Sequence, residues 1–206
     1  MKNEKAKVKI IPLGGVNEIG KNLTAIEYKN DIVVIDCGLK FPDEDMFGID
    51  LVIPDITYLI KNKEKVSGIF LTHGHEDHIG AIPYILKQIN MPVYGTKLTI
   101  GLVESKLKVP VYGTKLTLGI VETKLKEHGL LSSTELIRVK PRDVIRLNSV
   151  SVEFIKTNHS IADSVAIAVH TPLGVVLHTG DFKIDYTPID GELMDFARFA
   201  ELGKKG

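Results

Sequence analysis

A dense cluster of histidines and acids beside an apolar run constrains the fold of this chain more than any other feature. The stretch "LTHGHEDHIGAI" covers residues 71–82 and continues the run "VSGIFL". A short apolar β-branched run is typical of a buried strand, and the spaced apolar residues after it are typical of a helix. An extended chain points the side chains of His73 and His75 to one side. We expect Asp77 and His78 to follow in the turn before the helix, so that four ligand-type groups converge.

Short strand-like runs closed by turn residues recur along the chain. They cover residues 8–15, 23–28, 31–38, 66–73, 149–159, 164–171 and 174–181. Between them, helical patterns are predicted over residues 54–64, 79–90 and 115–129. This mixture of strands and helices predicts an α/β fold with a mixed sheet.

The composition suits one domain over residues 1–206. Of the 206 residues, 44% are hydrophobic and 25% charged, which provides enough apolar material for a core. No apolar run reaches the roughly 18 residues of a membrane span, and the start lacks the pattern of a signal peptide, so we expect a cytoplasmic protein without a membrane partner. Lys plus Arg equals Asp plus Glu at 26 each, so the overall charge neither favours nor excludes a nucleic-acid partner.

Residues 91–108 and 109–126 form a tandem copy, with 14 of 18 positions identical. Two copies are too few for a solenoid, which needs about three repeats to bury a continuous core. A duplicated unit of one strand and one helix is the simpler interpretation. Pro92 and Pro110 disfavour a helix in the residues before them, so the two copies should not merge into one long helix.

Three further strand-like runs end in residues that can bind metals, namely Asp36, His159 and Asp181. Side chains at the ends of neighbouring strands can face one cleft, so these residues and the cluster at 73–78 predict a divalent-metal centre. Cys37 is the only cysteine, which excludes a thiolate cluster and leaves imidazole and carboxylate donors. This donor set suits zinc, with manganese as an alternative, and an acid able to bridge indicates two ions.

The same residues carry a family resemblance. The stretch "THGHEDHIGAI" resembles the signature of the metallo-β-lactamase superfamily. The stretches "PLGGVNEIGKN", "FPDEDMFGIDLVIPDI", "NHSIADS" and "HTGDFKIDYTPIDGE" resemble the amino-terminal part of the bacterial ribonuclease J family, and the likeness covers the chain apart from the extra copy. Asn17 stands where the family usually has Gly, and Ala162 where Pro is common. The resemblance implies a metallo-β-lactamase-like αββα sandwich that is incomplete at its C-terminal side.

The resemblance also implies a role for each candidate residue. One zinc would be held by His73, His75 and His159, and the other by Asp77 and His78. Asp181 would bridge the two ions. Members of the family hydrolyse RNA, as 5′–3′ exonucleases and endonucleases, with a hydroxide that bridges the two metals. Asp77, His78 and Asp36 are therefore the catalytic candidates, and Asp36 would orient the metal ligands. A helix beginning near Ile79 would point amide donors towards the RNA.

A few residues carry weaker signals. A structural calcium in some relatives implies a similar site here at the Gly48 carbonyl and Asp50. His170 and His178 lie in strand-like runs, where a packed histidine is the simpler interpretation, although His178 could instead orient a metal ligand. His128 lies at the C-terminal end of a helical pattern and is expected to be a solvated residue favoured by the helix dipole.

The family pattern extends beyond this sequence. Ribonuclease J carries an inserted β-CASP domain, and "DFARFAELGKKG" at residues 195–206 resembles the segment just before it. We therefore expect an RNA-binding hydrolase impaired by truncation, with an exposed apolar edge that favours association into a homo-oligomer. Two alternatives stay open: another hydrolase of the same fold with a small substrate such as a thioester, and a non-catalytic metal-binding half-domain.

Overall fold

The chain folds into two β-sheets with helices on their outer faces. The computed structural model describes residues 6–89, 91–96, 99, 111–112 and 139–205. Its strands are β1 (Val8–Gly14), β2 (Leu23–Tyr28), β3 (Asp31–Ile35), β4 (Val66–Phe70), β5 (Val93–Tyr94), β6 (Val111–Tyr112), β7 (Val144–Arg146), β8 (Ser151–Lys156), β9 (Val165–Thr171) and β10 (Gly174–His178). Its helices are α1 (Thr57–Lys61), the 3-10 turn η1 (Lys63–Lys65), α2 (Glu76–Ile79), α3 (Ile82–Leu86) and α6 (Phe196–Lys205).

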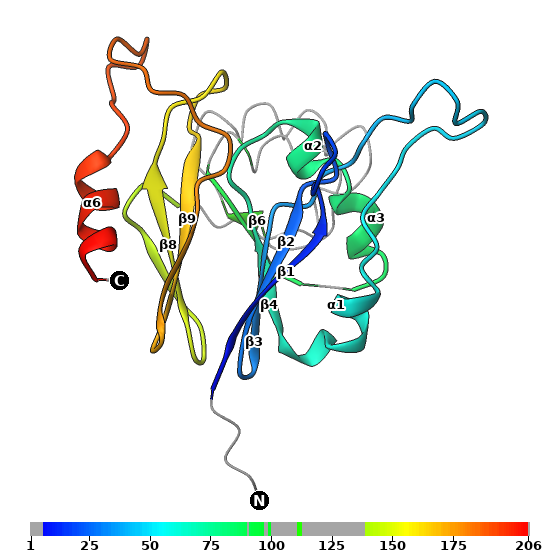
Figure 1. Cartoon of the computed structure of the whole chain (residues 1–206), viewed down its shortest axis with the longest axis horizontal. Coiled ribbons are helices and arrows are strands. Elements are labelled where there is room, and N and C mark those ends of the chain that lie inside the picture. Colours follow the sequence, from blue (N-terminus) through cyan, green and yellow to red (C-terminus); the bar gives the residue numbers. More distant parts are fainter. Residues whose placement is uncertain (1–5, 90, 97–98, 100–110, 113–138, 206) are drawn as a thin grey trace, which may run out of the picture.

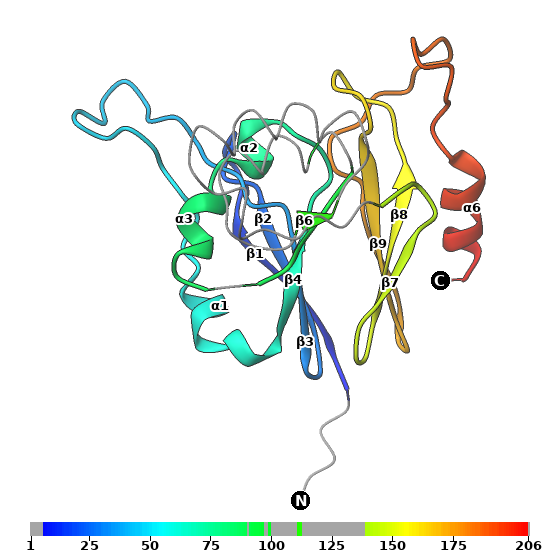
Figure 2. The ribbon, with the colours of Figure 1, turned by 180° about the vertical axis from the view of Figure 1, so that it is seen from behind.

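The two sheets lie face to face. One has six strands in the order β1-β2-β3-β4-β5-β6, and the other has four in the order β10-β9-β8-β7. Figure 1 shows α6 outside the four-stranded sheet and α1 and α3 outside the six-stranded sheet, and the view from behind in Figure 2 agrees. The αββα sandwich is confirmed in the described part of the chain.

The six-stranded sheet is mixed, as expected. Strands β1, β2 and β3 pair in antiparallel fashion, whereas β4, β5 and β6 run parallel to β3. All five residues of β3 are buried, because helices cover one face and the second sheet covers the other. This double burial explains the continuous apolar run "IVVI" in the sequence.

The two tandem copies contribute neighbouring strands to this sheet. β5 from the first copy pairs with β4, and β6 from the second copy pairs with β5, with Val93 opposite Val111 and Tyr94 opposite Tyr112. The Tyr94 ring stacks on Phe70 with a centroid distance of 4.3 Å. The first copy therefore occupies the place next to β4, and the second adds the end strand. Most of the remainder of both copies lies outside the described residues.

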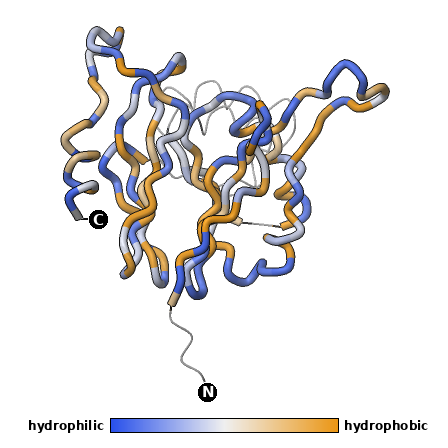
Figure 3. Tube along the Cα trace, in the orientation of Figure 1, coloured by the Kyte–Doolittle hydropathy of each residue, from blue (hydrophilic) through white to orange (hydrophobic). Residues whose placement is uncertain are grey.

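The main core lies between the sheets. Its buried members come from both inner faces, and they are Ile26, Tyr28, Val33, Ile35, Phe70, Tyr94, Val139, Val150, Val152, Phe154, Val165, Ile167 and Val169. Figure 3 shows that apolar residues follow the strands, while polar residues dominate many of the connecting loops. A second core joins the outer face of the six-stranded sheet to its helices through Leu59 of α1 and Ile82 and Ile85 of α3. Apolar contacts thus join the two sheets to each other and the six-stranded sheet to its helices.

An ion pair fixes α6 to the outer face of the second sheet. The Nε and Nη2 atoms of Arg198 donate to the two carboxylate oxygens of Glu153 on β8 at 2.7 and 2.8 Å. His170 on β9 lies 2.7 Å from the same carboxylate, and Leu202 packs on the apolar residues beside it. His170 is thus a packed strand histidine.

The structure corrects the expected helix over residues 79–90. Two short helices replace it, α2 ending at Ile79 and α3 starting at Ile82, with Pro83 in the first turn of α3. Asp77 and His78 lie inside α2 and not in a turn before a helix. The expected pattern over 54–64 contains only α1 and η1, and the one over 115–129 falls outside the described residues. Strand β7 and helix α6 were not expected.

A long connection between β3 and α1 projects from the domain (Figure 1). Phe41 and Phe47, which lie on it, are 65% and 92% exposed. Asn17, in the turn between β1 and β2, has a φ of 58°, a left-handed conformation that Gly and Asn tolerate best. Among the described residues, none of the helices has the length and apolar character needed to span a membrane.

Candidate metal centre

The candidate ligands lie at one end of the sandwich, where loops from both sheets meet. His73 and His75 lie between β4 and α2, His159 follows β8, and Asp181 follows β10. The two sheets are joined here by a hydrogen bond from the Val165 amide to the Thr72 carbonyl at 3.0 Å. The sandwich therefore brings together side chains that are far apart in the sequence.

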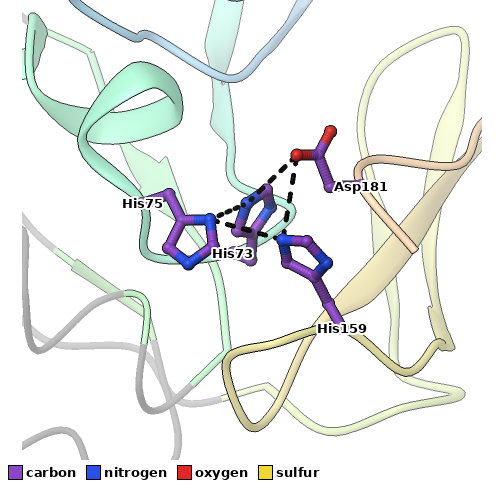
Figure 4. Close-up of side chains that lie close together, drawn as sticks. All are labelled: His73, His75, His159 and Asp181. Atoms are coloured by element: carbon purple, nitrogen blue, oxygen red, sulfur yellow. Dashed lines mark hydrogen bonds and ion pairs between the residues drawn. The ribbon is translucent and has the colours of Figure 1, made fainter. Parts of the chain in front are cut away.

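Four of these side chains converge on one point. The Nε2 atom of His73 lies 3.1 Å from Nδ1 of His75, and Nε2 of His159 lies 3.3 Å from the same Nδ1 atom. The Oδ2 atom of Asp181 lies 4.0 Å from His73 Nε2 and 3.8 Å from His159 Nε2. One ligand atom from each of the four lies within 4.8 Å of the other three. Figure 4 shows the three rings and the carboxylate pointing toward one another.

The environment keeps two of these imidazoles neutral. Burial lowers the pKa of His73 to about 3, with a further contribution from the neighbouring His78. Burial also lowers the pKa of His159, although Asp181 opposes the shift. A neutral imidazole offers a lone pair, which is the form that binds a metal. Three imidazoles and a carboxylate at these distances are a donor set that fits a divalent cation.

Asp77 and His78 form a separate group beside this cluster. His78 Nε2 lies 3.5 Å from Asp77 Oδ2 and 3.6 Å from Asp181 Oδ1. Asp181 thus faces the first cluster with Oδ2 and His78 with Oδ1, which is the arrangement that a bridging carboxylate needs. Within the described residues, however, only the first four side chains form a group tight enough to hold an ion.

Asp36 lies beneath this second group. Its carboxylate accepts hydrogen bonds from the Thr72 amide at 2.9 Å and from the Thr72 hydroxyl at 3.0 and 2.9 Å. Its Oδ2 atom lies 2.8 Å from Nδ1 of His78. Burial tends to raise the pKa of Asp36, but the charge and hydrogen bond of His78 lower it. Asp36 is therefore an anion that orients the His78 ring through its Nδ1 atom.

The pKa of His78 shifts in the opposite direction to that of Asp36. Burial tends to lower its pKa, but the carboxylates of Asp36 and Asp77 raise the pKa of His78 to about 10. The pKa of Asp77 is lowered, chiefly by its hydrogen bond with His78. A cation at this second group would have to displace the His78 proton, so the two groups differ in how readily they can take up a cation.

A glycine makes the approach of the two loops feasible. Gly38 follows β3 and lies so close to α2 that an added Cβ atom would lie 1.5 Å from the Asp77 carbonyl oxygen. The backbone around it pairs with α2, since the Cys37 amide donates to the His78 carbonyl at 2.7 Å. Any side chain at position 38 would push Asp36 and His78 apart.

Two residues of the site were missed in the sequence. Thr72, directly before the histidine cluster, binds Asp36 through both its amide and its hydroxyl. Asn22, just before β2, donates from Nδ2 to the carbonyl oxygen and to Oδ2 of Asp77 at 3.0 and 3.2 Å. Thr72 could have been found from its place beside His73. Asn22 offers no local signal, since its role depends on contacts across the fold.

The remaining candidates lie elsewhere. Gly48 and Asp50 are exposed on the projecting connection, and Asp50 belongs to no metal-binding group among the described residues, so the calcium site stays a prediction. His178 accepts a hydrogen bond at Nδ1 from the Gly180 amide at 3.2 Å. His128 falls outside the described residues.

A pocket of about 350 Å³ lies directly beside His159. Its walls come from residues 156–163, 183, 185 and 188–190. Its two lysines are paired with acids, Lys156 with Asp190 at 3.1 Å and Lys183 with Asp185 at 2.8 Å. The metal-binding cluster therefore adjoins a cavity whose cations are already largely neutralised.

Known proteins share both the sequence and the fold. Ribonuclease J of Synechocystis sp. is 50% identical over 201 residues, which cover 97% of this chain and 29% of that protein. Ribonuclease J2 of Bacillus subtilis is 45% identical over 205 residues, which cover 100% of this chain and 34% of that protein. The chain thus spans roughly a third of the length of these curated relatives.

A solved structure agrees on the fold. Unliganded yeast PDE1 superposes with a TM-score of 0.62 at 12% identity, covering 98% of this chain and 72% of that one. Residues 17–198 match the description "Metallo-beta-lactamase superfamily". With the αββα layers and the histidine cluster at the meeting point of the two sheets, this match over most of the chain shows that it belongs to the metallo-β-lactamase superfamily.

Proposed function

We propose that this chain is the metal-binding catalytic part of a ribonuclease of the ribonuclease J type, which hydrolyses RNA phosphodiesters with zinc. The observation that carries the proposal is the convergence of His73, His75, His159 and Asp181 within 4.8 Å. Identity of 45 to 50% to ribonuclease J proteins over nearly the whole chain supports RNA as the substrate.

The two groups of ligands would hold two cations. The first cation would bind His73, His75 and His159, with Oδ2 of Asp181. The second would bind Asp77 and His78, with Oδ1 of Asp181. A set of imidazole and carboxylate donors suits zinc, and manganese is the closest alternative. Bound divalent cations supply Lewis-acid activation of water and neutralise charge on the phosphodiester.

The residues of the chain would orient this chemistry. Asp36 would hold the His78 ring through Nδ1, leaving Nε2 to face the site. Thr72 would in turn hold Asp36, because it donates to both carboxylate oxygens. The pocket beside His159 would accept a nucleotide next to the reacting phosphate, because it adjoins the cluster and has room for a nucleoside.

Cleavage of RNA in the presence of added metal tests the proposal. The chain should hydrolyse a fluorescent single-stranded RNA slowly in zinc or manganese, as expected of an impaired enzyme, and lose this activity in a chelator. His159→Ala should abolish the activity, whereas His170→Ala, a histidine that pairs with Glu153 away from the cluster, should retain it. Hydrolysis of a thioester but not of RNA would contradict the assignment.

A further inference from the structure

Asn22 lies at the second group of ligands, although it is not a metal ligand in the proposed function. Its Nδ2 atom lies 3.2 Å from Asp77 Oδ2 and 3.1 Å from His78 Nε2. Among the described residues it is thus a neutral side chain placed between the two protein ligands of the second cation. Asn22 itself is half-buried, so solvent does not freely compete for its amide.

The orientation of the carboxamide follows from its surroundings. The amide nitrogen faces two oxygens of Asp77, the backbone carbonyl at 3.0 Å and Oδ2 at 3.2 Å. The carboxamide oxygen faces Gly15, where an added Cβ atom would lie 2.6 Å away. Rotating the amide by half a turn would set the carboxamide oxygen against both of these Asp77 oxygens, so the NH₂ group points to Asp77.

The backbone keeps Asn22 in this place. Its amide donates to the Asp77 carbonyl at 3.1 Å, and its carbonyl accepts from the Gly38 amide at 2.9 Å. These two bonds hold Asn22 against both α2 and the loop after β3. The carboxamide can therefore turn about its side-chain bonds, but it cannot move away as a whole.

An NH₂ group is a poor neighbour for a cation. Metal–ligand bonds are about 2.0–2.2 Å long, so an ion bound to both Asp77 and His78 would lie close to the positive end of the amide dipole. Binding would also remove the hydrogen bond that Asn22 makes to Asp77 Oδ2. The cluster of His73, His75 and His159 has no such neighbour among the contacts described above.

We propose that Asn22 is a positioning residue that makes the two halves of the metal centre unequal, by holding Asp77 for a second cation while opposing its entry. This inference rests on the proposed metal centre. It means that the first cation binds without hindrance, and that the second binds only when the carboxamide turns its NH₂ group away. Loading of the centre is then sequential.

Two substitutions of Asn22 should weaken its opposition to the second cation to different extents. Asn22→Ala removes the NH₂ group and both of its hydrogen bonds to Asp77, which should strengthen binding of the second cation about 2- to 10-fold. Asn22→Asp replaces the NH₂ group by a carboxylate oxygen of almost the same shape and adds a negative charge, so the gain should be larger, at least about 10-fold. Affinity for the first cation should stay within about twofold in both variants.

Calorimetric titration of the metal-free 206-residue chain with zinc, repeated with cobalt, resolves the two binding events. Cobalt absorption spectra report the ligands independently of any activity. Asn62→Ala is the matched control, because Asn62 is also half-buried and donates to a backbone carbonyl, that of Tyr58 at 2.9 Å, but lies far from the site in the chain segment after α1. Circular dichroism checks folding, and the isosteric Asn22→Asp variant alone suffices if Asn22→Ala does not fold.

The outcomes separate this inference from the proposed function. Stronger binding of the second cation in Asn22→Asp, with Asn62→Ala unchanged, supports the inference. An unchanged or weaker second event in that variant, with the first event intact, overturns the inference alone. A chain that takes up no cation at any concentration overturns the proposed metal centre as well.

Discussion

The Nδ1 atom of His78 lies 2.8 Å from Oδ2 of Asp36, and this contact determines where the other ring nitrogen of His78 points. Asp36 is fully buried and has a φ of 59°, a backbone conformation that few non-glycine residues adopt. The carboxylate is held by Thr72 on its other side. The buried carboxylate of Asp36, directly after β3, is thus held in place by Thr72 and orients His78.

Asp36→Asn should weaken metal binding while preserving the fold. The amide has the shape of the carboxylate but neither its charge nor its capacity to accept from both Thr72 and His78. Loss of such an orienting partner typically lowers metal affinity about 10- to 100-fold. Zinc affinity measured in competition with a chelator checks this, and an affinity equal to that of the wild type would show that Asp36 does not orient the ligand.

His75→Ala should remove most of the tightly bound metal. His75 Nδ1 is the atom that both His73 and His159 approach, at 3.1 and 3.3 Å, so its loss opens the middle of the cluster. Elemental analysis after dialysis should give well under one zinc per chain. His170→Ala is the control, and unchanged zinc in His75→Ala would remove His75 from the ligand set.

Tyr94→Ala should destabilise the chain more than Tyr112→Ala. Tyr94 is 7% exposed and stacks on Phe70, so its truncation should lower the free energy of unfolding by about 3 kcal/mol. Strand β6 ends the described sheet and has a neighbouring strand on one side only, so we expect Tyr112→Ala to cost less. Urea denaturation measures both. Equal losses, or a larger loss at Tyr112, would mean that the second copy lies next to β4.

Deletion of residues 91–108 should leave a folded, metal-binding chain. The second copy carries the same "PVYGTKLT" stretch and could then pair with β4, and no proposed ligand is lost. The midpoint of thermal unfolding should be equal or higher. A folded deletion variant that no longer takes up zinc would assign the first copy to the site.

Glu27→Gln should make the free energy of unfolding depend less on pH in the acid range. Glu27 on β2 is 4% exposed and accepts hydrogen bonds from Lys9, Tyr58 and Lys65 at 2.8, 2.5 and 2.9 Å. Burial tends to raise its pKa, but these three donors lower the pKa of Glu27 from 4.5 to about 2. A lowered pKa stabilises the fold above pH 4.5, and this contribution is lost as the pH falls toward 2.

The variant should therefore be less stable than the wild type by about 1 to 3 kcal/mol at pH 7. The difference should shrink as the pH falls from 4.5 toward 2. Denaturation at several pH values measures it. Glu64→Gln, which removes the same charge from a side chain that is 89% exposed, should change stability little at any pH. A difference in the free energy of unfolding between Glu27→Gln and the wild type that stays constant from pH 7 to pH 2 would show that ionisation of Glu27 does not stabilise the fold.

Much of the fold could be predicted because its strands carry strong local signals. The runs around β3 and β9 are apolar and β-branched, and burial on both faces requires such runs. Strand β7 has three residues and α2 has four, which are too few to show a period. For α2 this had a consequence, because Asp77 and His78 were placed in a turn when they belong to a helix that starts at Glu76.

The local residue pattern predicted the site in residue type but not in arrangement. Histidines and acids at strand ends pointed to the six candidate ligands, since little else explains such residues there. Their division into a tight group of four and a separate Asp77 and His78 was implied only by the family resemblance and not by the local residue pattern, because it depends on Gly38, which brings two loops into contact, and on Asn22. Contacts of this kind join residues far apart in sequence and leave no periodic signal.

The tandem copy lies between two ligands of the first cation, since 84 positions separate His75 from His159. A cation held by both histidines would close that stretch into a ring, as a disulfide does. The entropy of ring closure grows only with the logarithm of ring size, so the 18 residues of one extra copy cost about 0.2 kcal/mol. An insertion of this length inside β3 or β9 would shift the register of a buried strand. Between the two histidines it leaves the closing of the ring almost unaffected.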